Sequence, residues 1–537
     1  MRSNPTTIPE QGSGRAIRRG RPGGALLRSS VLLIYAVCIV GTLVHALQIE
    51  NSAESKFYLT LAGLSTYLAV ESYFYLRHRD NVSLLSPAVL ASLAHFLLAY
   101  VTGATASIFD PWIIERFTLF VTDLYDEMTS AVLLIWLAAF AMWRGYYFPM
   151  APARRLRRRL ERSQVLRPDF KPAVRLLVGL QIVFVAMVIF AISRGIFGIS
   201  STSELRLESV GILYFVKIAI DGGALGLFLL FLYYFQKAAD TGRNSVPLAI
   251  FCYSLLCLHV MVGAISGFKS QIFMPFVYYG VAYFVATRRV PVLAVVAAGV
   301  ALVISYQVIQ PYRTYLYENN VGGRADVGVL MDALEASGRQ KDELTNTDQT
   351  MGTQIFSRFD LLGMTAAGLS YARAGRITDA ERSRFGQSIV LAPVLAYVPR
   401  AIWKDKPVFS TGVWFNQNVL GKYDDVSTSV GMGPVTYLYY AGGVVMVFLG
   451  FAFFGAFQAI LFEGVGRSGF GGLLVYFGVA NSLAFIPSDF GPMLGGVLKI
   501  LPLVVVAQYV LLQARPKARP GGLAPNPVGA RPSTVAG

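Results

Sequence analysis

The sequence predicts an all-α, polytopic integral membrane protein with about twelve transmembrane helices and one large extracytoplasmic loop between the ninth and tenth. Its 537 residues are 54% hydrophobic and 15% charged, whereas a soluble domain is typically about 45–50% apolar and about 25% charged. The apolar residues occur in blocks of about 20, the length that crosses a bilayer as a helix. Lys and Arg gather in alternate connections between these blocks, which indicates a fixed orientation in the membrane.

The blocks follow one another along two stretches of the chain, nine of them in 29–309 and three in 436–513. Polar breaks at 266–270 and 287–289 separate the seventh, eighth and ninth blocks. The segments 1–28 and 514–537 are rich in Arg, Pro and Gly and too poor in apolar residues to fold alone, so we expect disordered tails there. The predicted helices cover 29–48, 57–76, 83–104, 128–147, 173–193, 211–235, 246–265, 271–287, 290–309, 436–462, 470–486 and 493–513.

The basic residues predict that both termini are cytoplasmic. Ten Lys and Arg residues lie in the connection 144–175, and six Arg lie in 1–28. Cytoplasmic connections carry such an excess, and the reverse orientation would place the 144–175 cluster outside. Anchoring beside anionic headgroups also accounts for most of the net charge of +16, so nucleic-acid binding is not expected. The three cysteines lie inside predicted spans, which leaves no disulfide framework outside the membrane.

The extracytoplasmic loop, 310–435, is the segment from which we predict function, because loops of this length are usually functional. It holds thirteen Lys and Arg residues and no His. Two stretches, 355–371 and 388–403, are apolar but too short to span, which favours interfacial or re-entrant helices. We therefore expect the loop to lie on the membrane as a lid over a cavity.

Three motifs in and beside the loop stand out. Gly267-Phe268-Lys269-Ser270 opens an apolar span; the run 399–407 has the pattern Pro-Arg-x-x-Trp-x-x-Lys-Pro; and a Gly-rich, Tyr-rich segment precedes the tenth span. In these motifs the chain resembles the O-antigen polymerase family of bacterial oligosaccharide repeat-unit polymerases. It departs from the family pattern at Lys404, where Pro is common, at Ala441-Gly442, and at Thr436, where a carboxylate is expected.

The resemblance implies a GT-C-like polymerase or ligase architecture in the bacterial cytoplasmic (inner) membrane. It also implies the activity, which is transfer of a growing glycan from polyprenyl diphosphate onto the next lipid-linked repeat unit at the outer leaflet. The implied partners are polyprenyl-diphosphate-linked oligosaccharides, the lipid bilayer and a chain-length regulator protein, with no cofactor.

The charged and aromatic residues of the loop suit this chemistry. A diphosphate leaving group needs neutralising, and Arg does so with paired hydrogen bonds. The sequence has no Asp-x-Asp motif for a metal, so we expect cationic side chains to act instead. With no loop His, the base that activates the acceptor hydroxyl must be a carboxylate. The candidates are Asp360 and Asp405 as catalytic residues, with Asp424 and Asp425 as alternatives; Arg400, Arg313, Arg358, Lys269 and Lys406 for the diphosphate; and Trp403, Trp414 and Asn416 for sugar.

Simpler interpretations stand beside these. Arg400 and Lys269 also suit headgroup anchors, and Arg313 and Arg358 suit structural ion pairs within the loop. Lys217 and Asp221, four residues apart at helical depth, suit a buried structural pair. At the level of function, the alternatives are an O-antigen-type ligase or another lipid-phosphate-dependent glycosyltransferase, and then a transporter or flippase. The concentration of polar residues in one loop, rather than through the spans, favours an enzyme.

Overall fold

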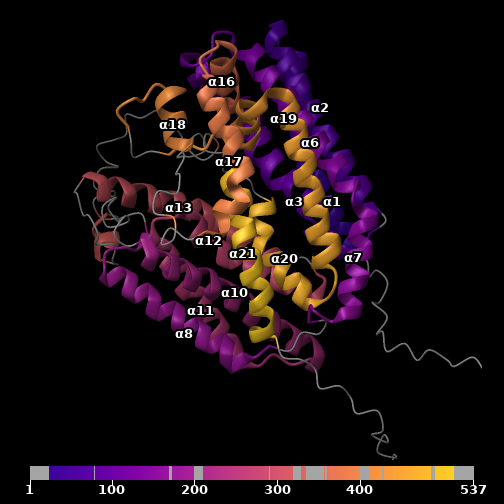
Figure 1. Ribbon diagram of the computed structural model, residues 1–537, viewed down its shortest axis with the longest axis vertical. Coiled ribbons are helices and arrows are strands. Elements are labelled where there is room, and N and C mark those ends of the chain that lie inside the picture. The colour runs from indigo at the N-terminus through magenta and orange to yellow at the C-terminus, as the bar shows by residue number, and fades with distance from the viewer. Residues whose placement is uncertain are drawn as a thin grey trace, which may run out of the picture.

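The computed structural model is all-α (Figure 1). Eighteen α-helices and several 3₁₀- and π-helical stretches make up the described part of the chain, with an isolated bridge between Pro172 and Leu512. The structure describes residues 23–77, 79–167, 172–198, 210–289, 291–318, 328–333, 335, 356, 360–398, 403, 411–425, 429–484 and 490–512.

One group of long helices packs around α6 (Leu124–Tyr147) and α19 (Gly433–Ala459). α1 (Gly23–Gln48) lies against α2 (Ser52–Arg77), which in turn packs on α6 (Figure 1). The α6–α19 contact is close because Gly145 and Gly455 leave the two backbones room to approach each other. Small residues serve the same purpose between helices in membranes.

A second group consists of five helices that pack against one another. α12 (Lys269–Thr287) contacts α10 (Val210–Thr241), α11 (Val246–Ser266) and α13 (Val292–Glu318), and α10 also contacts α8 (Val174–Ser193). α11 and α12 are joined by a tight turn in which Gly267 adopts φ +73°. Only glycine takes this left-handed conformation without strain, which explains the glycine in the sequence motif.

One end of the bundle, here called the basic end, carries α7 (Met150–Ser163) and a buried polar network. α7 packs through Ala153 and Leu156 on the π-helical stretch that follows α19, Ile460–Gly466, and five of its six Arg are exposed. In the network, buried Glu463 accepts a hydrogen bond from Tyr75 at 2.8 Å and pairs with Arg79. Burying a carboxylate is favourable only with such partners.

The opposite end carries three shorter helices, here called the cap: α16 (Leu361–Arg373), α17 (Asp379–Tyr397) and α18 (Thr411–Asn418). α16 packs on α6 and α19, and α17 packs on α19 and on α21 (Phe490–Leu511). Figure 1 shows the cap at the top and α7 at the lower right. The segments 361–397 and 411–418 of the predicted loop therefore form helices at the far end from the 144–175 basic cluster.

The membrane prediction is confirmed at the level of a multi-pass protein. Eight helices in the described part are long and apolar enough to cross a membrane. The other four predicted apolar blocks lie in α2, α12, α13 and α20 (Phe470–Ala484). Within the described residues, α13 and α20 contribute the shorter apolar stretches Val292–Ser305 and Phe470–Ala484.

Two expectations need correction. The second apolar stretch of the loop belongs to a longer helix, because α17 begins at Asp379, nine residues before 388. A capping box causes this earlier start: Thr378 accepts from the Glu381 N–H at 3.2 Å, and Glu381 accepts from the Thr378 N–H at 2.9 Å. Lys217 and Asp221 do pair, at 3.7 Å, but both side chains are more than half exposed, so the pair is not buried.

Candidate functional site

Asp360 occupies the junction between the bundle and the cap. Its side chain is fully buried and caps α16 by accepting a hydrogen bond from the Gly363 N–H at 3.0 Å. The other carboxylate oxygen lies 3.2 Å from a guanidinium nitrogen of Arg116. Burial raises the pKa of the Asp360 carboxyl, while Arg116 and the Gly363 N–H act in the opposite direction. Both oxygens of the predicted base are thus bound within the protein.

Arg116 reaches Asp360 from the connection that precedes α6. Its guanidinium lies over the ring of Phe117, 4.8 Å from the centroid, and 5.5 Å from that of Trp112. The α16 backbone approaches the same ring at Gly363, where any Cβ would collide with Phe117. The ion pair and this close approach fix the start of α16 on the bundle.

Two further contacts join α16 to the start of α19. The hydroxyls of Thr365 and Thr436 are 3.2 Å apart and buried, and the Tyr440 hydroxyl donates to the Gly368 carbonyl at 3.0 Å. The sequence resemblance predicts a carboxylate at position 436. In this structure Thr436 instead forms a contact between α16 and α19. These polar contacts set the position of α16 relative to α19.

An aromatic cluster made of Tyr371, Phe385, Trp414, Tyr437 and Tyr440 holds the three cap helices together. Ring centroids within it lie 5.3–6.0 Å apart in edge-to-face geometry, which such pairs prefer. Trp414 of α18 is half-buried here, and its indole N–H donates to Glu381 of α17 at 2.9 Å. This hydrogen bond and those from Thr378 overcome the effect of burial and lower the pKa of the Glu381 carboxyl.

Two of the three predicted sugar-binding residues, Trp414 and Asn416, therefore make packing contacts within the cap. Trp414 joins the cluster just described. Asn416 is fully buried and donates to Asp425 at 3.1 Å. Trp403 keeps an exposed ring, so among the three it is the one available for stacking on a sugar.

α17 descends beside α21. Gly491 lies close to the Ser388 carbonyl, Gly495 close to that of Ala392, and the Tyr397 hydroxyl donates to the Leu498 carbonyl at 2.7 Å. The two helices thus run parallel, and α17 ends about two turns into α21. The chain toward Arg400 leaves from this level, next to the exposed Lys499.

Lys269 and Arg313 lie on the second helix group. Lys269 is the first residue of α12 and is partly buried. Arg313 follows Tyr312 near the end of α13, and the Tyr312 hydroxyl donates to the Ile265 carbonyl at 3.2 Å. α13 packs on α11 and α12, whereas the cap packs on α6, α19 and α21. Lys269 and Arg313 thus belong to the second helix group and not to the cap.

Several predicted residues fall outside the described part of the chain: Arg358, Arg400, Asp405 and Lys406, together with the side chain of Arg313. Within the described part, no three His, Cys, Asp or Glu side chains form a group that could hold a metal.

Sequence reasoning missed the roles of Arg116 and Glu381. A lone Arg between Trp112 and Phe117 in a short loop was the available signal for Arg116.

Comparison with known proteins yields one match. Residues 228–482 match the model of a family described as a domain of unknown function, DUF8712. The matched segment runs from α10 through the cap and α19 to α20. No curated protein and no solved structure is significantly similar to the chain.

Proposed function

We propose that this multi-pass protein polymerises lipid-linked oligosaccharide repeat units. A glycan would pass from its polyprenyl diphosphate carrier to the acceptor hydroxyl of the next lipid-linked unit, without a metal. The cap and the end of the bundle beneath it are the proposed reaction site, and the sequence resemblance to O-antigen polymerases supplies the substrate class.

The proposed orientation places the basic end in the cytoplasm and the cap outside a bacterial inner membrane. The Arg residues of α7 support it, because cytoplasmic connections are enriched in Lys and Arg. In this orientation α2, α12, α13 and α20 join the eight long apolar helices as crossings. A thiol-specific, membrane-impermeant reagent should label a cysteine substituted at Gln417 of α18, but not one at Arg159 of α7, in intact cells. The opposite labelling pattern would contradict the orientation.

The course of α17 beside α21 is the observation that supports this proposal best. A polyprenyl diphosphate carries its phosphates where the membrane-embedded chain meets the water-exposed sugar. Tyr397, at the end of α17, lies beside Leu498 of α21, and the run 399–407 with Arg400 and Lys406 begins two residues later in the sequence. A basic run so near an apolar helix in sequence suits a segment that meets phosphates at the membrane surface.

The arrangement within the cap reassigns the proposed base. Glycosyl transfer requires a carboxylate that can reach the acceptor hydroxyl. Asp360 is occupied by Arg116 and by the start of α16, so we assign it a positioning role. Asp405, within the 399–407 run and near Arg400 in sequence, becomes the proposed base. Arg400 and Lys406 then stabilise the departing diphosphate.

The activity itself can be measured with the purified full-length protein in proteoliposomes that contain a synthetic polyprenyl-diphosphate-linked repeat unit. We expect a ladder of products with two or more units, and we expect the same ladder in excess EDTA, because cationic side chains hold the diphosphate. Loss of the ladder in EDTA with recovery in magnesium or manganese would contradict metal-independent transfer. A single transfer to another acceptor, with no ladder, would instead identify a ligase.

Arg400 is expected to contribute strongly to the rate of transfer. A charge-assisted hydrogen bond contributes roughly 1.5–3 kcal/mol, or about 10- to 150-fold in rate if it forms mainly in the transition state. Arg400→Ala should lose that factor, and Arg400→Lys should lose less because the charge remains without the planar fork. Chain-length distribution at matched protein abundance provides the measurement. Arg384→Ala, at an exposed arginine of α17, is the matched control, and equal chain lengths in both variants would make Arg400 a lipid anchor.

A further inference from the structure

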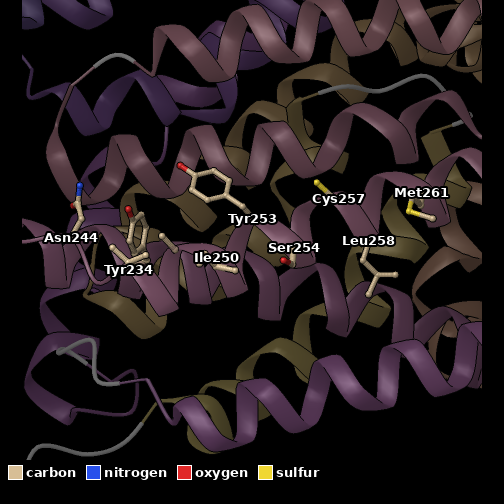
Figure 2. Close-up of a pocket in the computed structure, with 10 residues that line it drawn as sticks. Tyr234, Asn244, Ile250, Tyr253, Ser254, Cys257, Leu258 and Met261 are labelled. Atoms are coloured by element: carbon tan, nitrogen blue, oxygen red, sulfur yellow. The ribbon is translucent and has the colours of Figure 1, made fainter.

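A long groove runs along α11 on the outer surface of the second helix group, away from the cap (Figure 2). It has a volume of about 750 Å³ and is lined by side chains of α10, α11 and the connection between them. The lining residues at its two ends are Asn244 and Met261 (Figure 2). From Val246 to Met261 the helix rises ~22 Å, more than the ~15 Å depth of one leaflet of the hydrocarbon core.

The groove is apolar along the helix and polar at one end. Val246, Ile250 and Met261 are each more than half exposed, although they belong to one of the eight candidate spans. Small side chains, Ser254 and Cys257, leave the middle of the groove open. The polar end is formed by Asn244 and the Tyr234 side chain. A ligand for this shape needs an extended apolar chain and a single polar group.

The polar end also has an excess of positive charge. Lys237 and Arg243 lie within one to two helical turns of the groove's end and are exposed, with Asp240 the acidic residue between them. α12 runs back alongside α11, so Arg288 and Arg289 at its end add to the same region. Arg288 interacts electrostatically with Asp80 and Arg467 of the polar network, which places this end of the groove at the basic end of the bundle.

We propose that the groove binds an anionic phospholipid, with an acyl chain along α11 and the phosphate beside Asn244, Lys237 and Arg243. The charge at one end favours this occupant over a second copy of the chain, since two copies would bring like charges together. The site lies at the opposite end of the molecule from the cap, so it does not depend on the proposed glycan chemistry.

The proposal is tested by native mass spectrometry of the full-length protein in detergent, titrated with phosphatidylglycerol or phosphatidylcholine. Wild type should bind one phosphatidylglycerol more tightly than phosphatidylcholine. Each basic residue at a headgroup contributes about 5-fold in affinity, so the double variant Lys237→Gln, Arg243→Gln should weaken phosphatidylglycerol binding by roughly 30-fold. Its matched control, Arg154→Gln with Arg158→Gln, removes two exposed charges of α7 at the same end and should change this binding little.

The groove itself is tested by filling it. Ser254→Trp places a bulky ring in the middle and should abolish the tight site for both lipids. Val37→Trp, at a residue of α1 that is 65% exposed, should leave it intact, and thermal unfolding checks that both variants are folded. Equal lipid binding by all four variants would show annular lipid only and overturn the proposal. The proposal would also be overturned if wild type had the mass of a dimer and Ser254→Trp that of a monomer. The groove would then be a dimer interface.

Discussion

Asp360→Ala is expected to destabilise the protein by about 3 kcal/mol, while Asp360→Asn should retain part of that stability. Alanine removes the N-cap of α16, typically about 1 kcal/mol. It also leaves Arg116 without its carboxylate, a loss of about 3–5 kcal/mol for a fully buried pair that we reduce to about 2 kcal/mol because the Arg116 side chain is 22% exposed and can be partly solvated. Asparagine is itself a good N-cap and keeps the shape of the side chain. Asp360→Asn therefore loses only the charge interaction with Arg116. Thermal unfolding of the three purified proteins provides the measurement.

The same pair of variants separates a structural Asp360 from a catalytic one. If Asp360 only positions the cap, transfer activity per folded molecule should be largely retained in Asp360→Asn. An Asn variant with wild-type stability and no activity would show that Asp360 is the base after all. If Asp360→Ala were as stable as wild type, the ion pair between Arg116 and Asp360 would not be what holds α16 in place.

Gly455→Ala and Gly145→Ala are expected to disrupt the packing of α6 against α19, by about 3 kcal/mol or more each. A Cβ at Gly455 would lie 2.8 Å from the Met142 carbonyl carbon and 2.9 Å from the Tyr146 nitrogen, and one at Gly145 would lie 2.7 Å from the Ala452 carbonyl carbon. These neighbours are backbone atoms of a helix, which cannot rotate away as a side chain would. Overpacking of this kind costs about 1–3 kcal/mol and sometimes more.

Gly179→Ala is the matched control for this prediction. Gly179 lies in α8, and a Cβ there would meet no atom within 4 Å. Because alanine also favours the helix over glycine, this variant should accumulate at least as well as wild type. The measurement is the fraction of monodisperse protein after detergent extraction, together with its midpoint of thermal unfolding. Similar losses in all three variants would point to a general effect of replacing glycine rather than to the α6–α19 contact.

The helices could be predicted from the sequence because their signal is local. Runs of about 20 apolar residues and Gly267 at a turn each act within a few residues of the chain. The capping box of Thr378 and Glu381 is equally local, but the apolar pattern alone placed the start of that helix nine residues too late. No water is present in the bilayer core, so the backbone N–H and C=O groups of such a run must bond to each other. A single continuous apolar run does this by forming a helix. The multi-pass architecture and a helical loop at 310–435 followed from these patterns.

The side-chain roles could not be predicted in the same way. Asp360 was selected by its type and by the absence of loop histidines, but its partner Arg116 is 244 residues away. Glu463 and Arg79 are separated by 384 residues, and both were unremarkable in the sequence. Trp414 and Asn416 suited sugar contacts by composition, yet their neighbours in space make them packing residues.

The sequence alone thus determined that the chain crosses a membrane many times, where its helices lie, and that a long loop rich in Arg and Lys precedes the tenth apolar block. The tertiary structure decided that α16, α17 and α18 of this loop form a cap, that α17 descends beside α21, and that Asp360 is held by Arg116. The physical reason is the range of each effect. Hydrophobicity and capping act over a few residues, whereas burial and ion pairing depend on which distant helices pack together.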